Sequence, residues 1–124
     1  MIAHPEGGWY RETWRHASTV DTPRGPRSLA TAVAFLLLPG EESAWHRVAS
    51  DELWLWQGGG PVELMLGGSG PSPALESSLV LGPGGQGLVP ANVWQSARPS
   101  DDRATLVACI VSPGFDFADF TLAD

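Results

Sequence analysis

Short apolar segments separated by glycine and proline are the feature that most limits what this chain can fold into. Glycine and proline together make up about a fifth of the 124 residues and occur along the whole chain. No stretch of the length of a typical helix has a convincing 3.6-residue apolar periodicity, whereas short apolar runs between turn-forming residues are typical of β-strands. The pattern predicts an all-β domain, a sandwich or barrel of antiparallel strands.

We expect about nine short strands from this pattern. They cover residues 9–16, 30–38, 43–49, 52–57, 62–66, 76–81, 88–89, 93–98 and 104–112. Residues 18–28 contain two prolines and a glycine and are expected to form a loop. The tail, residues 115–122, fits either a short helix or a closing strand, and the pattern does not decide between them.

The charge of the chain excludes two kinds of partner. It contains seven basic residues, all arginine, and 14 acidic residues, which give a net charge of -7. Nucleic acids and anionic membrane surfaces bind basic patches. We therefore expect neither nucleic acid nor a membrane as a partner, and a small-molecule ligand remains.

Cysteine content and hydropathy lead to a single cytoplasmic domain. The one cysteine, Cys109, excludes an internal disulfide and a site of several thiolates, and its apolar neighbours predict a buried side chain. The longest apolar run, residues 29–38, is too short to cross a membrane, and residues 1–8 lack the pattern of a signal peptide. We expect one domain over residues 1–124, in the cytoplasm.

One predicted strand presents a mixed polar and aromatic face. Side chains alternate along a strand, so Glu52, Trp54 and Trp56 share one face. Leu53 and Leu55 share the other face and look like core against the second sheet. His46 and Gln95 are expected to point into the same interior as Glu52. Buried ionisable groups are costly unless they are paired, so a small barrel that keeps them is expected to hold a ligand pocket.

The residues around this expected pocket resemble two sequence motifs of the cupin superfamily of small β-barrels. The first motif is matched, with its spacing, by Gly40, His46, Glu52 and Gly59, while Val48 stands in the place of a second histidine. The second is matched by Gly84 and Pro90, with Asn92 at a glycine position and Gln95 at a histidine position. Asparagine suits the glycine position because it tolerates a positive φ better than most residues.

Four longer stretches are similar to one small, largely uncharacterised family, sometimes called cupin family five. They are residues 4–10, 43–52, 93–95 and 113–117, and together they span nearly the whole chain. The resemblance implies a double-stranded β-helix, a jelly-roll barrel that usually forms homodimers. The general activity of that family is not established, so the resemblance implies a fold rather than a reaction.

The resemblance also bears on a metal cofactor. In metal-binding cupins, three histidines and one glutamate hold a divalent ion. This chain keeps His46 and Glu52, but has the hydrocarbon of Val48 and the amide of Gln95 in two of the other positions. We therefore expect no cofactor; if a metal binds, its expected ligands are His46, Glu52 and Gln95.

His46 and Glu52 are the catalytic candidates. An imidazole titrates near neutrality and can donate or accept a proton, and a neighbouring carboxylate can orient it. This pair suggests proton transfer on a sugar-like or carbonyl metabolite, as in an epimerase, an isomerase or a dehydratase. The alternative interpretation is a structural hydrogen bond between the two side chains, and the sequence leaves both open.

Other residues are candidates for substrate binding. Gln95 would hold a substrate oxygen, Trp54 and Trp56 would flank a ring, and Tyr10 would supply a hydroxyl. Glu6 and Tyr10 lie beside two glycines, which makes a structural use the first expectation for both. The function classes left open are an enzyme of this kind, a non-catalytic metabolite sensor, and a metal cupin with reduced ligation.

Overall fold

The computed structural model describes residues 1–124 as thirteen β-strands and one short 3-10 helix, η1. The expectation of an all-β fold is confirmed. The elements are β1 (Ile2–Ala3), β2 (Trp9–Arg15), β3 (Thr19–Thr22), β4 (Gly25–Ser28), β5 (Thr31–Leu37), β6 (Ser43–Val48), β7 (Asp51–Gly59), β8 (Val62–Leu66), β9 (Ser77–Leu81), β10 (Gln86–Val89), β11 (Gln95–Pro99), β12 (Thr105–Ser112), η1 (Phe117–Asp119) and β13 (Phe120–Leu122).

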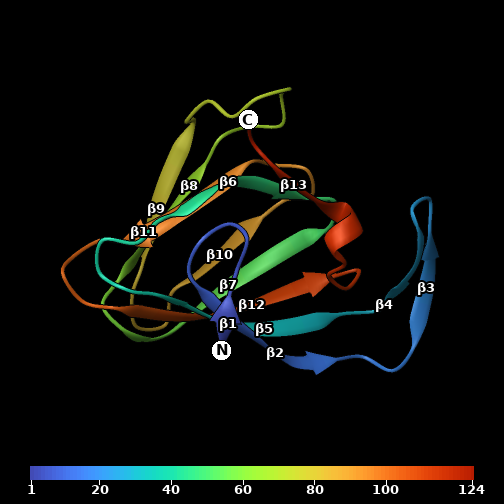
Figure 1. Ribbon diagram of the computed structural model, residues 1–124, viewed down its shortest axis with the longest axis horizontal. Coiled ribbons are helices and arrows are strands. Elements are labelled where there is room, and N and C mark those ends of the chain that lie inside the picture. Colours follow the sequence, from blue (N-terminus) through green and yellow to red (C-terminus); the bar gives the residue numbers. More distant parts are fainter.

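Two antiparallel sheets face each other and form a flattened barrel (Figure 1). The larger sheet has the strand order β1-β2-β5-β12-β7-β10, and the smaller has the order β13-β6-β11-β8-β9. The remaining strands, β3 and β4, pair only with each other and extend from one side of the barrel (Figure 1).

The core lies between the two sheets and consists of side chains from alternate positions of each strand. Phe35 on β5, Trp54 on β7 and Val107 on β12 point inward from the larger sheet, and Val62 and Leu64 on β8 meet them from the smaller one. All five are at most 3% exposed. Burial of each such side chain contributes about 1.5–3 kcal/mol, so this packing holds the sheets together.

The segment expected to be a loop at residues 18–28 is instead a hairpin. Asp21 pairs with Pro26 across it, and Thr22 Oγ1 accepts a hydrogen bond from Arg24 N and donates one to Gly25 O. Proline is tolerated here because a two-stranded ribbon consists only of edge strands, which leave one side of the backbone unpaired. The loop prediction was wrong because prolines exclude a central strand but not an edge strand.

The expected core position of Leu53 and Leu55 is also wrong. Both lie on the outer face of the larger sheet and are half-buried, while Glu52 and Trp54 on the inner face are buried. Strand periodicity separates the two faces but does not say which one points inward, because both faces of this strand carry large apolar side chains. The expectation that Asn92 accommodates a positive φ is confirmed, since its φ is 65°.

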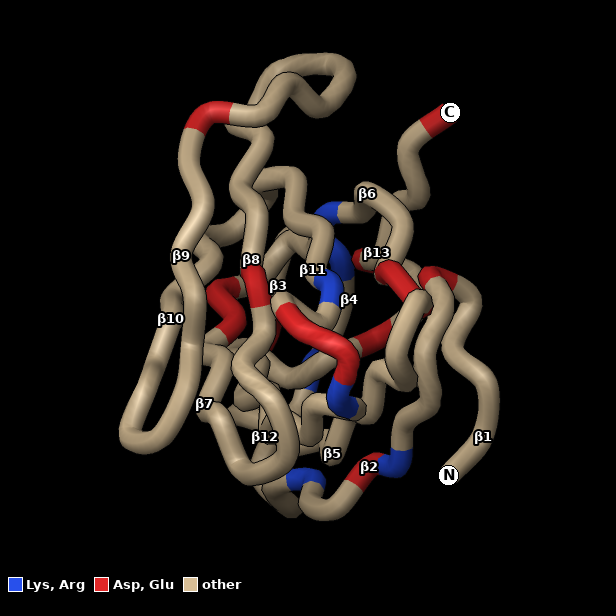
Figure 2. The backbone as a smooth tube through the Cα atoms, turned by 90° about the vertical axis from the view of Figure 1, so that its left-hand side faces the viewer, with Lys and Arg blue, Asp and Glu red and all other residues tan.

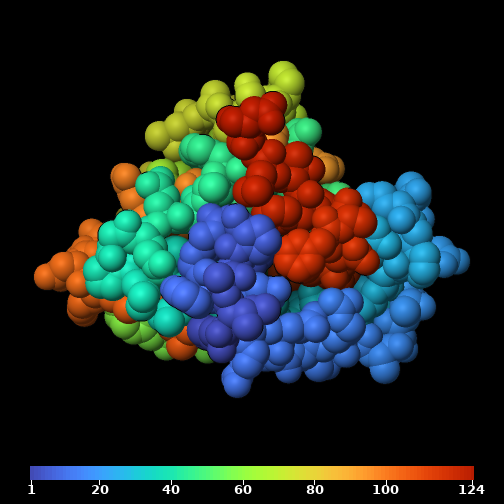
Figure 3. Space-filling model, viewed as in Figure 1, coloured from blue at the N-terminus to red at the C-terminus, as the bar shows by residue number.

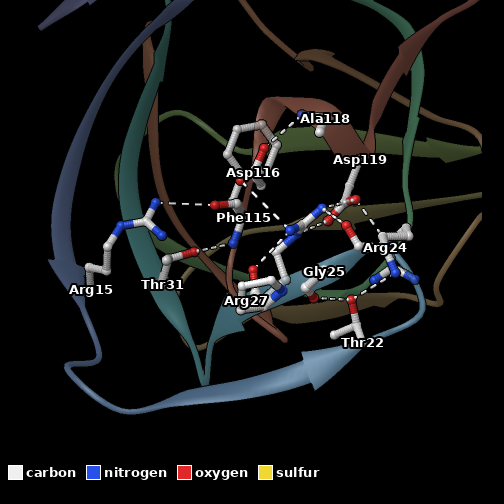
Figure 4. Close-up of polar contacts among 11 residues, drawn as sticks. Arg15, Thr22, Arg24, Gly25, Arg27, Thr31, Phe115, Asp116, Ala118 and Asp119 are labelled. Carbon is white, nitrogen blue, oxygen red and sulfur yellow. Dashed lines mark hydrogen bonds and ion pairs between the residues drawn. The ribbon is translucent and has the colours of Figure 1, made fainter.

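The C-terminal segment contains both structures that the sequence left open, because η1 is followed directly by β13. Asp116 caps η1, and its side chain accepts a hydrogen bond from Ala118 N at 2.8 Å. Asp119 is buried and accepts two hydrogen bonds from the guanidinium of Arg27, at 2.8 and 2.9 Å, and one from Arg24 at 2.9 Å (Figure 4). This ion pair fixes the C-terminal segment to the β3–β4 hairpin.

Candidate functional site

A glycine-rich turn near the N-terminus places two ionisable side chains against the barrel. His4 N donates to Gly8 O at 3.0 Å and Gly7 N donates to His4 O at 2.9 Å, which closes the turn. Gly7 and Gly8 have φ values of 99° and 78°, and a Cβ on Gly8 would lie 2.7 Å from Cζ of Phe35. Only glycine fits such a conformation at so close an approach. The turn therefore carries His4 and Glu6 into the barrel mouth.

A small cavity of about 40 Å³ lies between this turn, the inner sheet faces and the C-terminal segment. Its lining consists of aromatic and aliphatic side chains around two histidines and two glutamates: His4, Glu6, Tyr10, Val33, Phe35, His46, Val48, Glu52, Trp54, Cys109, Val111, Phe115 and Phe120. Figure 3 shows the N-terminal and C-terminal segments side by side on this face of the molecule. A cavity of this size admits about three water molecules, or the reacting end of a small metabolite.

His46 meets Glu6 at the centre of this cavity. His46 Nδ1 lies 2.8 Å from Ala44 O, and a carbonyl oxygen only accepts, so Nδ1 carries a proton. His46 Nε2 lies 2.7 Å from Glu6 Oε2, and the two side chains are 3% and 10% exposed. Two lone pairs at that distance would repel each other, so the contact requires a proton on one of the two atoms. The N–H does not point straight at the carboxylate, which leaves Glu6 Oε2 without a well-aligned donor.

The electrostatic surroundings of His46 favour its charged form. Burial is the largest single influence and acts to lower the pKa of His46, while the negative charge of Glu6 acts to raise it. The close contacts of the ring with Glu6 Oε2 and Ala44 O and the charge of Glu52 also act to raise this pKa, and the raising influences together outweigh burial. The result is a raised pKa, so we assign His46 as an imidazolium paired with a carboxylate near neutral pH.

His4 lies against the same carboxylate, with Nδ1 3.2 Å from Glu6 Oε1, but its ring is neutral. Glu6 N donates to His4 Nδ1 at 3.1 Å, so this nitrogen bears a lone pair and the proton of the neutral ring is on Nε2. Burial is the largest influence and lowers the pKa of His4. A neutral histidine and a charged histidine therefore flank Glu6. Neighbouring titratable groups whose pKa values are shifted in opposite directions are typical of acid–base sites.

Glu52 belongs to a second, adjacent chain of hydrogen bonds. Trp54 Nε1 donates to Gln95 Oε1 at 3.1 Å, and Gln95 Nε2 donates to Glu52 Oε1 at 3.0 Å. Burial raises the pKa of Glu52, although the charge of His46 acts to lower it. Burial also raises the pKa of the Cys109 thiol well above its usual value, which keeps that sulfur protonated. Cys109 is buried, as the sequence predicts.

The structure brings most of the expected site residues together. His46, Glu52, Trp54 and Tyr10 line the cavity. Trp56 and Gln95 do not. The indole nitrogen of Trp56 donates to Gly60 O at 2.9 Å. Both ends of the Gln95 amide are already bonded to Glu52 and Trp54.

Two residues that the sequence analysis did not place at the site, His4 and Glu6, provide its closest contacts. Their one sequence signal was a pair of ionisable residues on either side of a proline, directly before two glycines.

The cavity does not have the donor set of a metal site. No three histidine, cysteine, aspartate or glutamate side chains lie where they could hold a metal ion together. Val48 offers a metal only hydrocarbon, and the Gln95 side-chain oxygen already accepts a hydrogen bond from the Trp54 indole N–H. Catalytic metal sites usually have three protein ligands, and this arrangement does not fit one.

Facing antiparallel sheets around a small cavity with acid and imidazole groups define a β-barrel of the cupin class. The family model described as "Cupin superfamily (DUF985)" matches residues 1–123. The chain belongs to this family, and the resemblance to cupin family five is confirmed.

Two solved structures match almost the whole chain. Protein SO0799 from Shewanella oneidensis is 35% identical, with a TM-score of 0.84, over 98% of this chain and 77% of its own. A hypothetical protein from Leishmania major is 32% identical, with a TM-score of 0.81, over 97% of this chain and 80% of its own.

A more distant structure confirms the fold. A Klebsiella pneumoniae protein with a double-stranded β-helix domain is 17% identical, with a TM-score of 0.68, over 99% of this chain and 84% of its own. The expected double-stranded β-helix is thus confirmed. No curated protein matches the chain. No element of the structure is a helix with the length and apolar character that a membrane crossing needs.

Proposed function

We propose that this protein is a metal-independent enzyme that transfers protons on a small sugar-like or carbonyl metabolite, as an epimerase, isomerase or dehydratase. The observation that carries the proposal is the 2.7 Å contact between His46 Nε2 and Glu6 Oε2. An acid and a base that touch each other inside an aromatic cavity can each serve one end of a proton transfer.

The contact geometry gives each group a role. Glu6 Oε2 lacks a well-aligned donor, so it can take a proton from the carbon next to a substrate carbonyl. His46 delivers a proton to the substrate oxygen from Nε2, and the neutral His4 donates a hydrogen bond from its own Nε2. The enediol that results becomes product when Glu6 returns a proton to carbon and the neutral Nε2 of His46 takes a proton back from oxygen, which restores the carboxylate and the imidazolium. Glu52, whose charge acts on His46, tunes the acidity of that imidazole.

Proton exchange into a small hydroxycarbonyl compound tests this proposal without knowledge of the natural substrate. We expect the protein to speed deuterium incorporation at the α-carbon of dihydroxyacetone in D₂O, followed by NMR. His46→Asn keeps an amide N–H for Ala44 O but removes Nε2, and should reduce the exchange rate by about 100-fold or more.

His16→Asn is the matched control, because His16 lies outside the cavity lining. Its exchange rate should equal that of the wild type. Equal rates for His46→Asn and the wild type would contradict the proposal. Binding of the compound without any exchange would instead support the metabolite sensor.

We also propose that a second copy of the chain covers the outer face of the larger sheet. Small and aliphatic side chains of its three central strands occupy this face and are half-buried rather than covered: Ala32, Ala34, Leu36, Leu53, Leu55, Leu106, Ala108 and Ile110. At its margins Trp14 and Leu88 are 48% and 54% exposed. An apolar face of this kind marks an interaction site.

The charge and the size of this face support a homodimer. Strands β5, β10 and β12 contain no charged residue, and the tube of β10 is tan in Figure 2. The charged residues that share this face, Arg11 on β2 and Asp51 at the start of β7, lie away from its centre, so two acidic copies can meet there without repulsion. The six strands lie about 4.8 Å apart, and strands of about seven residues give a face on the order of 600 Å². That area approaches the roughly 800 Å² per partner of a standard interface. A cytoplasmic location also remains our proposal.

A further inference from the structure

A groove of about 420 Å³ adjoins the catalytic cavity and is not used by the proton transfer proposed above. Its lining, which we call the outer groove, consists of Tyr10, Glu12, Arg15, Val33, Phe115, Asp116 and Phe117. Tyr10, Val33 and Phe115 also line the cavity, so the two spaces meet at these side chains. The cavity holds only a few atoms, so the body of a larger substrate needs a neighbouring space, and the outer groove is the one that borders the cavity.

The one cation of the outer groove is already neutralised. Arg15 Nη2 donates to Glu12 Oε1 at 2.6 Å and to Phe115 O at 3.1 Å. Figure 4 shows the Arg15 side chain directed at the Phe115 carbonyl. A guanidinium paired with a carboxylate attracts a phosphate less strongly than an unpaired one does.

The anionic groups of the outer groove are less completely paired. Asp116 Oδ1 accepts from Ala118 N, while Oδ2 lies 4.0 Å from Arg27 Nη1, beyond hydrogen-bond distance. Glu12 uses only one of its two oxygens in its contact with Arg15. With two carboxylates against one guanidinium, the lining is net negative, and the chain as a whole has a net charge of -7. An anionic substrate body is therefore repelled.

Aromatic rings complete the outer groove. Phe117 is 47% exposed, and its ring lies 4.9 Å from that of Phe115, measured between centroids. The apolar C–H face of a sugar ring packs on such rings, while its hydroxyls donate to carboxylates and accept from a guanidinium. From this arrangement we infer that the outer groove binds a hydroxyl-rich substrate body without negative charge and excludes phosphorylated and nucleotide-linked sugars. The inference rests on the proposed function only in one respect: it assumes that the reacting end of the substrate lies in the cavity.

Saturation-transfer NMR with paired probes tests this inference. We expect signal transfer to D-glucose or D-galactose, and affinities for their 6-phosphates that are weaker by about tenfold or more. Phe117→Ala should weaken binding of the neutral sugars, because it removes the exposed ring without changing charge. D-glucosamine, which carries a positive charge, should bind at least as tightly as D-glucose, because a net negative lining that repels a phosphate attracts an ammonium group; weaker binding of D-glucosamine would contradict the charge argument.

A charge-neutralising double variant provides the sharpest comparison. Glu12→Gln with Asp116→Asn changes the lining from net negative to net positive, while the amide oxygen of the introduced asparagine can still cap η1. We expect this variant to gain affinity for the 6-phosphates. Glu76→Gln with Asp102→Asn is the matched control, because it removes the same charges from exposed positions outside the groove. It should behave as the wild type.

The outcomes separate the two proposals. If the wild type binds the 6-phosphates as well as the neutral sugars, or binds neither, the inference on the outer groove is overturned, whatever the exchange of dihydroxyacetone shows. If the sugars bind and respond to the variants as expected, the outer groove stands, even if the same protein exchanges no proton into dihydroxyacetone. Only the proposed reaction would then be overturned.

Discussion

Two histidines share the carboxylate of Glu6, and their backbone contacts decide whether Nδ1 of each ring carries a proton. Ala44 O accepts a hydrogen bond from Nδ1 of His46, whereas Glu6 N donates a hydrogen bond to Nδ1 of His4. The sequence predicted His46 as a site residue from its position on an inward strand face. It did not predict Glu6 as its partner, because a contact between a turn and a strand some forty residues apart follows from tertiary packing and not from spacing.

At the scale of single residues we predict that Glu52→Gln stabilises the protein at neutral pH. Burial raises the pKa of Glu52, so the folded state binds this proton more tightly than the unfolded state does. The resulting stabilisation is complete below the usual pKa of 4.5 and is lost as pH rises through the folded-state value. A glutamine keeps an oxygen for Gln95 and has no charge to bury.

Thermal melts of the two proteins at several pH values measure this effect. At pH 7 the melting temperature of Glu52→Gln should exceed that of the wild type by a few degrees, roughly 2–4 °C. The difference should shrink towards pH 4. A variant less stable than the wild type at pH 7 would show that the charged carboxylate is well compensated. A gain in stability by loss of a site residue is typical of functional positions.

The element that completes the cavity is the C-terminal segment. Phe115 and Phe120 line the cavity, and the ring of Phe120 stacks on that of His46 with centroids 5.5 Å apart. The alternation of aspartate and phenylalanine here left helix and strand open, since a capped 3-10 turn followed by a strand contains both patterns. The partners of Asp119 were not predictable, because Arg24 and Arg27 fell in a segment that was taken for a loop.

At the scale of elements we predict that Asp119→Asn loosens this segment. The variant leaves the buried side of Arg27 without its carboxylate, and the melting temperature at pH 7 should fall by about 5 °C. Asp102→Asn, at an exposed position, should melt like the wild type. An unchanged melting temperature for Asp119→Asn would mean that the ion pair does not hold the segment.

The same residue predicts part of the acid denaturation. Hydrogen bonds from Arg27 hold the pKa of Asp119 below its usual 3.8. A lowered folded-state pKa stabilises the protein above pH 3.8, and this stabilisation is lost as pH falls further, through the folded-state value. The melting temperature of the wild type should therefore fall more steeply than that of Asp119→Asn below about pH 4.

For the whole molecule, the pattern of short strands and turns predicted the barrel, and the inward face of β7 was predicted correctly to include Glu52 and Trp54. The outer face was not, because half-buried leucines on an uncovered sheet follow the same alternation as core leucines. Only the position of the strand within the larger sheet shows that Leu53 and Leu55 point away from the second sheet.

We predict that a charge on this outer face prevents pairing of two copies. Ile110→Arg places a guanidinium at the middle of β12, and sedimentation should detect monomers where the wild type forms dimers. Leu75→Arg adds the same charge at a position that is 64% exposed in a loop, and should leave the dimer intact. A wild type that sediments as a monomer would overturn the homodimer.

The cavity takes its walls from two segments far apart in the sequence, the turn at His4 and the segment at Phe120. During synthesis on a ribosome, the acid–imidazole pair would stay open to water until β13 had emerged and joined the sheet. Proteolysis that cuts out either of these two segments should likewise open the cavity before it unfolds the barrel.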